Sequence, residues 1–113
     1  MTGKPMNCPA EYTLALIGGR WKIPLIFHLM SGVRRFSELS RTLTGVSQKM
    51  LTQQLREMER NGLVERKVYA QVPPRVEYAL TPLGRSLKPV VDAMCRWGET
   101  HGPSAAGREA PPS

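Results

Sequence analysis

The chain has few of the residues that enzymes, metalloproteins and secreted proteins rely on. It contains two cysteines, Cys8 and Cys95, and two histidines, His28 and His101, among 113 residues. Two cysteines make neither a disulfide framework nor a zinc site, and reduced thiols are expected. No glycine-rich phosphate loop, nucleophile elbow or paired carboxylates in an apolar setting occur, so neither catalysis nor a cofactor or metal is expected.

Long apolar runs are also absent. The opening MTGKPMNCPA lacks the apolar stretch of a signal peptide, and no run approaches the roughly 18 residues of a membrane-spanning helix. A membrane-surface helix would combine positive charge with a Trp- or Phe-rich face, and no stretch does so. The sequence therefore predicts a cytoplasmic protein without a membrane partner.

Acidic residues are outnumbered by basic ones, and the imbalance is local. The formal net charge is +7. The segment from Arg20 to Arg75 holds 11 Lys and Arg against 4 Glu, a difference of 7, while the remaining residues hold 5 of each sign. A localised basic excess attracts polyanions, because binding releases their counterions.

The stretch SQKMLTQQLREMERNGLV, which begins at Ser47, predicts an amphipathic helix in the middle of this basic segment. Leu51, Leu55 and Met58 fall on one side of it, with the spacing of a buried stripe. Ser47 is a suitable N-cap, and Gly62 stands where a left-handed residue would end the helix. Lys, Arg, Gln, Ser and Thr are the side chains that reach bases and phosphates in a DNA groove. The opposite face carries Lys49, Thr52, Gln53, Arg56 and Arg60, with Gln48 beside them. By itself, such a face is more often the solvated side of an ordinary surface helix.

The segments before this helix predict three more helices. Apolar spacing indicates helices over residues 9–17 and 21–30, each ended by glycine, and a short third helix over residues 36–43. Trp21 is expected in the core, and His28 is expected to be structural because no second ligand stands at metal spacing. A tight turn around Gly45 joins the third helix to the one at Ser47. Two helices joined in this way, the second basic on its outer face, form the helix-turn-helix pattern.

The segments after Gly62 predict a β-hairpin and a long final helix. Residues 63–69 and 75–81 read as strands around a loop at 70–74, with Lys67 and Arg75 flanking its tip. Such charge also occurs on hairpins merely to keep them soluble. The last helix starts at Thr81-Pro82 and is expected to kink or divide at Pro89. Residues 1–7 are expected to be a flexible lead-in, 8–101 one domain and 102–113 a disordered tail.

Five motifs together resemble the HxlR-type winged helix-turn-helix transcriptional regulators. The resemblance extends from about residue 8 to residue 98. Its motifs are CPAEYTLALIGGRWK (8–22), RFSEL (35–39), GVSQKMLTQQLREMERNGLVER (45–66), VPPRVEYALTPLGRSL (72–87) and the late WG (97–98). The resemblance implies a mainly α-helical winged helix-turn-helix with a small β-hairpin. It further implies a homodimer, held by the N- and C-terminal helices, that binds an inverted-repeat operator in double-stranded DNA.

The resemblance also implies roles for particular residues. Arg35 would contact phosphate at the start of a helix, and Arg75 would lie at the wing. Cys8 matches a cysteine that some members use to sense electrophiles or oxidants, and Cys95 of the other subunit is a conceivable partner. A buried, inert Cys8 is the alternative. The recognition helix would carry Ser47, Gln48, Lys49, Thr52, Gln53 and Arg56.

Two other functions compete with sequence-specific DNA binding. A winged helix can serve as a protein-interaction module, since fold does not fix function; the concentrated charge argues against this, because protein interfaces are depleted in charge. RNA binding is less favoured, because the basic face lacks aromatic residues for base stacking. Repression is the expected outcome of operator binding, with activation left open, and no effector can be named.

Overall fold

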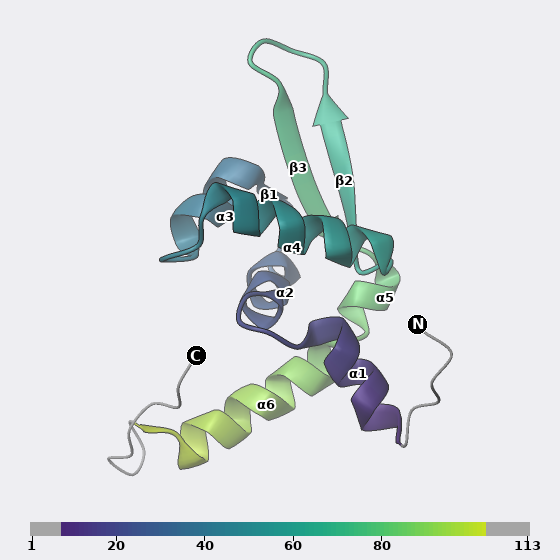
Figure 1. The fold of residues 1–113 in the computed structure, drawn as a ribbon, viewed down its shortest axis with the longest axis vertical. Coiled ribbons are helices and arrows are strands. Elements are labelled where there is room, and N and C mark those ends of the chain that lie inside the picture. The colour runs from purple at the N-terminus through teal and green to yellow at the C-terminus, as the bar shows by residue number, and fades with distance from the viewer. Residues whose placement is uncertain (1–7, 104–113) are drawn as a thin grey trace.

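The computed structural model describes residues 8–103, and the expected lead-in and most of the expected tail lie outside this range. A small antiparallel sheet projects from a mainly helical body (Figure 1). This is the winged helix-turn-helix architecture that the sequence predicts. The elements are α1 (Pro9–Ile17), α2 (Lys22–Met30), β1 (Arg34–Arg35), α3 (Phe36–Thr42), α4 (Gln48–Arg60), β2 (Val64–Tyr69), β3 (Arg75–Leu80), α5 (Pro82–Arg85) and α6 (Lys88–His101).

Helix α4 has the ends and the buried side that its sequence predicts. The Ser47 hydroxyl accepts a hydrogen bond from the Met50 N–H at 3.1 Å, which satisfies one of the donors left free in a first helical turn. Gly62 follows the helix with φ +76°, a conformation that favours glycine. On the inner side, Leu51, Leu55 and Met58 are buried. Apolar burial on one side therefore fixes which side of α4 faces outward.

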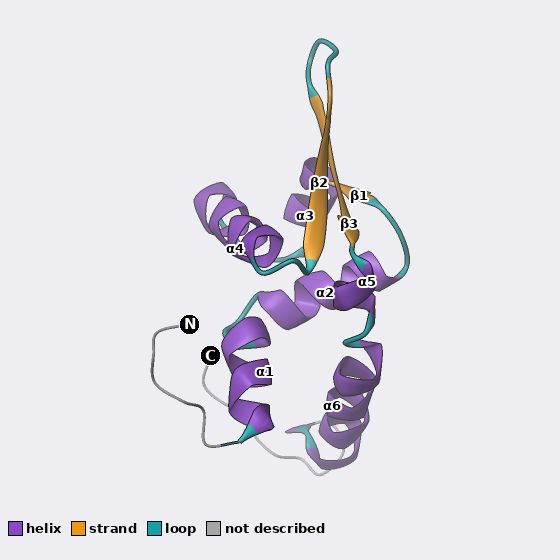
Figure 2. Ribbon diagram, turned by 90° about the vertical axis from the view of Figure 1, so that its right-hand side faces the viewer, coloured by secondary structure: helices purple, strands orange, loops and turns teal. Residues whose placement is uncertain are grey.

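The sheet is larger than the predicted hairpin by one short strand. Strands β2 and β3 pair antiparallel around the expected loop at 70–74, and β1 pairs with the other edge of β3, in the order β1-β3-β2. At the base of the hairpin, Val64 and Leu80 are buried, whereas Val68 further along is 54% exposed. The hairpin thus leaves the core as an exposed wing, standing beside α4 (Figure 2).

Helix α2 runs through the core and carries a buried lysine. Trp21 before the helix is buried, as predicted, and His28 is partly exposed with its ring edge-on to Phe27 at 5.5 Å. Lys22 belongs to the basic segment of the sequence, but it is only 7% exposed. Its Nζ lies 2.8 Å from Oε1 of Glu57 on α4. The ammonium group is buried because this carboxylate neutralises it.

The final helix is divided in two, one of the outcomes expected from Pro89. Thr81 caps α5, its hydroxyl accepting from the Gly84 N–H at 3.0 Å. The same hydroxyl donates to the Gly62 carbonyl at 2.5 Å, and the Thr81 N–H donates to the Leu63 carbonyl at 3.1 Å. These bonds fasten the end of α4 to the start of the C-terminal helices.

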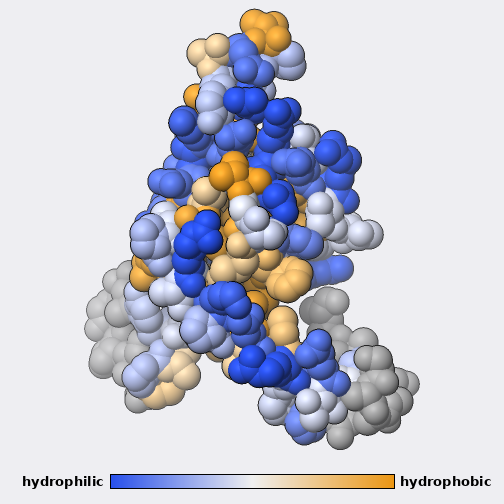
Figure 3. Space-filling view, turned by 180° about the vertical axis from the view of Figure 1, so that it is seen from behind, coloured by the Kyte–Doolittle hydropathy of each residue, from blue (hydrophilic) through white to orange (hydrophobic). Residues whose placement is uncertain are grey.

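Helices α1 and α6 lie on the far side of α2 from the wing (Figure 2), and both expose apolar side chains. Leu14 and Trp97 are each 66% exposed, Tyr12 50% and Met94 46%. A groove between the two helices is lined almost entirely by apolar groups from Ala10, Thr13, Leu14, Ile17, Ile23, Val90 and Met94. The wing, in contrast, is mostly hydrophilic below its tip when the molecule is seen from behind (Figure 3).

Within residues 8–103, no helix combines the length and apolar character needed to cross a membrane.

Candidate nucleic-acid interface

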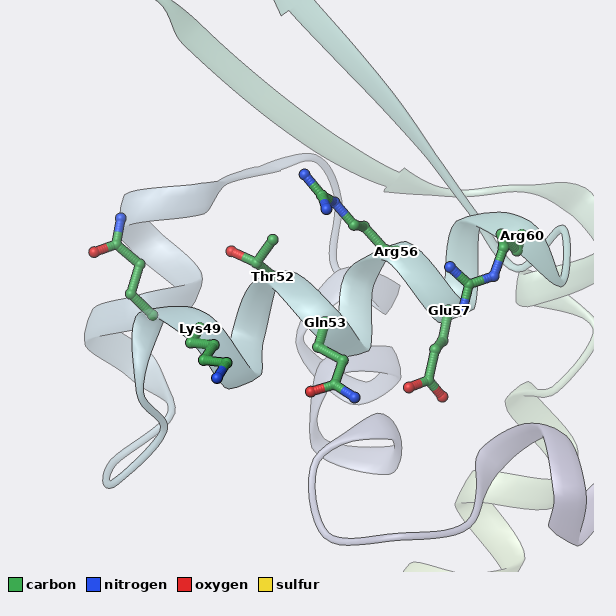
Figure 4. A pocket seen from close by; sticks show the side chains of 7 residues that line it. Lys49, Thr52, Gln53, Arg56, Glu57 and Arg60 are labelled. Carbon is green, nitrogen blue, oxygen red and sulfur yellow. The ribbon is translucent and has the colours of Figure 1, made fainter.

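The outer face of α4 forms a shallow hollow lined by polar side chains. Figure 4 shows Thr52 and Arg56 directed toward the wing, while Lys49 and Gln53 point toward the opposite edge of the helix. Lys49, Gln53 and Arg56 are exposed, and Thr52 is partly exposed. The full lining is Gln48, Lys49, Thr52, Gln53, Arg56, Glu57 and Arg60. The recognition-helix residues predicted from the sequence thus share one accessible surface, except Ser47, which is outside the lining and caps the helix.

Two glutamates lie on or near this face, and each has a basic partner. Glu57 lines the hollow, and its carboxylate receives the buried Lys22 ammonium at 2.8 Å. Glu59 lies 3.6 Å from the Arg66 guanidinium of β2. Because both carboxylates are paired, the unpaired charges that α4 presents are those of Lys49, Arg56 and Arg60 among the described residues.

A buried tyrosine lies at the base of the wing. Tyr78 on β3 is 7% exposed. Burial raises the pKa of Tyr78, while the positive charges of Arg66 and Arg56 oppose the rise. The phenol is neutral at physiological pH, as an unperturbed tyrosine would also be, so Tyr78 adds no charge beside α4.

Arg20 approaches the helix-turn-helix turn, which the sequence did not reveal. Its guanidinium lies 4.6 Å from the centroid of the Trp21 ring. It is also among the nearest groups to Gly45, in the turn before α4. Trp21 in turn donates its Nε1–H toward the Met50 sulfur at 2.9 Å. The sequence shows only the charge of Arg20, because its position depends on how α1 and α2 meet.

On the wing, the ring of Tyr69 lies against both basic residues that the sequence predicted there, Lys67 and Arg75. The Arg75 guanidinium lies 4.1 Å and the Lys67 ammonium 5.2 Å from the Tyr69 ring centroid. Tyr69 faces Arg75 across the strand pair and stands two residues from Lys67, on the same side of β2. Cations are attracted to aromatic faces. Tyr69 is a functional candidate that only the register of the hairpin could have indicated.

The remaining predicted residues divide between this surface and the other end of the molecule. Arg35 is exposed immediately before α3, and its N–H donates to Glu38 Oε1 at 2.7 Å. Cys8 caps α1 and Cys95 lies on α6; both are exposed and free. No group of three or more His, Cys, Asp or Glu in the described range could hold a metal ion.

A basic, amide-bearing helix after a tight turn, followed by a charged hairpin, defines a winged helix-turn-helix DNA-binding protein. The sequence profile of the HxlR-like helix-turn-helix family matches residues 16–106, and the chain belongs to this family.

Named relatives of the chain are transcriptional regulators and not enzymes. The HTH-type transcriptional regulator YybR of Bacillus subtilis (strain 168) is 52% identical over 95 residues, which cover 84% of this chain and 76% of YybR. The redox regulator HypR in its reduced form is 48% identical with a TM-score of 0.83, covering 89% of this chain and 100% of HypR. Its oxidised form is 52% identical with a TM-score of 0.78, covering 83% and 97% of the two chains.

Proposed function

We propose that the chain is a homodimeric regulator that binds an inverted-repeat operator in double-stranded DNA and represses transcription. The outer face of α4 carries this proposal: it offers Lys, Arg, Gln and Thr side chains on one accessible surface whose glutamates are paired. A helix enters the major groove with such side chains reaching base edges, and contacts from outside the helix hold the phosphates. An operator occupied in this way blocks access of RNA polymerase to a promoter.

The apolar surfaces of α1 and α6 support the homodimer. Leu14 and Trp97 are each two-thirds exposed, at 66%, which is costly for side chains of this size in a monomer. A two-fold axis through these helices would place two copies of α4 in successive major grooves, about 34 Å apart. An effector would act where these helices meet or at Cys8.

Separate losses of base and backbone contacts would test the proposal. Gln53→Ala is expected to relax sequence preference, costing about 1–3 kcal/mol on the operator and little on random DNA. Lys67→Ala is expected to weaken both DNAs alike and to lower the salt slope by about one. Binding to DNA fragments, starting with the region upstream of the chain's own gene, would be measured at several salt concentrations. Arg85→Ala, on α5, provides the control.

If Gln53→Ala weakened binding to operator and random DNA to the same extent, as Lys67→Ala is expected to do, these assignments would be contradicted. If no fragment is bound selectively by the unmodified protein, the basic surface is a non-specific footprint. A protein-interaction role would then take precedence.

We further propose that Cys8 senses oxidants or electrophiles. Its thiol is exposed and free at the start of α1, within the proposed dimer contact. HypR is described as a redox regulator with an oxidised and a reduced form. A thiol placed there would change the relation of the two subunits when it is modified, and thereby the spacing of the two α4 helices.

Oxidation of cysteine variants would test this sensing role. A mild thiol oxidant such as diamide is expected to change operator affinity at least tenfold, a difference of about 1.4 kcal/mol, in the unmodified protein but not in Cys8→Ala. Cys95→Ala is the matched variant: if Cys8 pairs with Cys95 of the other subunit, the covalent dimer on a non-reducing gel disappears in both variants. An unchanged oxidant response in Cys8→Ala would refute sensing at Cys8.

A further inference from the structure

A second hollow, of about 390 Å³, lies between the start of α3 and the loop of the wing. Strand β1 places Arg35 opposite Glu77 of β3, so that the start of α3 adjoins the hairpin (Figure 1). The lining is Arg35, Phe36, Ser37, Gln71, Pro73, Pro74, Arg75 and Val76. Two segments that are far apart in the sequence therefore contribute two guanidinium groups, a hydroxyl and an amide to one hollow.

The charge of this hollow differs from that of its neighbours. The hollow on α4 includes Glu57, and the hollow on the outer side of the wing includes Glu65 and Glu77. No carboxylate lines the hollow between α3 and the wing. The two charged groups that line it are both positive, and Arg75 is also paired with Glu77, which lies beside the hollow and not in its lining. Such an environment favours an anion.

Neighbouring side chains hold Arg75 in place, whereas Arg35 is less constrained. Arg75 is held against the Tyr69 ring at 4.1 Å. It forms an ion pair with Glu77, in which its buried Nε lies 3.5 Å from Oε2 without making a hydrogen bond. The Arg35 side chain is exposed, and no acidic side chain of residues 8–103 forms an ion pair with it. One guanidinium is thus pre-oriented, and the other is free to close on a ligand.

We propose that this hollow is a phosphate clasp, in which Arg35 and Arg75 donate to the same phosphodiester of the DNA backbone. The clasp rests on the proposed DNA-binding function and deepens it. Planar guanidinium groups bind phosphate oxygens through paired N–H donors. Ser37 and Gln71 supply neutral donors beside them. Because one phosphate is bound by α3 and the wing together, it fixes the wing relative to the groove that α4 enters.

The number of phosphates can be counted from the salt dependence of binding. Each neutralised phosphate contributes about 0.9 to the slope of log K against log salt. Arg35→Ala and Arg75→Ala are each expected to weaken binding about tenfold. With one shared phosphate, the double variant is expected to lose about 0.9 of slope and about 10- to 30-fold in affinity. With two separate phosphates, the slope would fall by about 1.8 and the losses would multiply to about 100-fold.

Operator and random DNA would both be used, since a phosphate contact does not depend on sequence. If the unmodified protein binds its operator selectively but the affinity losses of Arg35→Ala and Arg75→Ala multiply in the double variant, the clasp is overturned and the proposed function stands. If the unmodified protein binds no fragment selectively, but the double variant loses little more affinity for random DNA than each single variant, the clasp is supported and sequence-specific regulation is not. No loss in any variant would overturn the clasp. Arg85→Ala is the charge control, and the double Arg→Gln variant replaces the alanine pair if circular dichroism shows that the latter is unfolded.

Discussion

Gly84→Ala is expected to lower the free energy of unfolding by about 3 kcal/mol, near the upper end of the usual cost of overpacking. Gly84 is buried in α5. A Cβ at position 84 would clash with the backbone carbonyl oxygen of Leu63 and lie 3.0 Å from Leu80 Cδ2. The carbonyl belongs to backbone that cannot move independently, because it also accepts the Thr81 N–H at 3.1 Å.

The same substitution is expected to weaken DNA binding in the protein that still folds. Leu63 lies in the short link between α4 and β2, so displacing its carbonyl shifts the junction between the recognition helix and the wing. Urea denaturation would measure stability, and DNA titration the affinity. Gly98→Ala is the matched control for stability, since nothing lies within 4 Å of a Cβ at that helical position. There, alanine is expected to stabilise by about 0.5–1 kcal/mol. Equal effects of the two substitutions would contradict the proposed clash.

The elements that the sequence predicted are those whose signals are local. Apolar spacing placed α4, and the cap at Ser47 and the glycine at 62 placed its ends within a residue. Alternation in residues 75–81 located β3 because Tyr78 and Leu80 pack inward. In each case, short-range spacing is sufficient, because neighbouring turns or alternate strand positions share one side of an element.

What the sequence did not indicate depends on tertiary contacts. Strand β1 has two residues, too few for a periodic pattern, and it exists because β3 offers an unpaired edge. Lys22 looks like surface charge until α2 and α4 are packed together. Arg35 and Arg75 were both predicted to contact DNA, but that they line one hollow follows only from the sheet.

Glu57→Gln is expected to destabilise the fold by about 3 kcal/mol, at the lower end of the cost of breaking a buried ion pair. The substitution leaves the Lys22 side chain, 9% exposed, without its carboxylate partner at 2.8 Å. Lys22→Met is expected to cost less, about 1 kcal/mol, because the Glu57 side chain is 30% exposed and water can solvate it. The double variant is expected to be more stable than Glu57→Gln alone, because it removes the unpaired charge.

The order is reversed for DNA affinity, which is expected to fall in Lys22→Met and not in Glu57→Gln. Lys22→Met leaves an unpaired carboxylate on the outer face of α4, where it repels phosphate, so affinity is expected to fall about tenfold on every sequence. Glu57→Gln removes that charge, so the folded fraction is expected to bind DNA at least as tightly as the unmodified protein. Urea denaturation and DNA titration of the three variants would measure both effects. If Lys22→Met bound DNA normally, the buried lysine would serve packing alone; if it bound weakly and the double variant recovered, Lys22 would also determine the charge of the recognition surface.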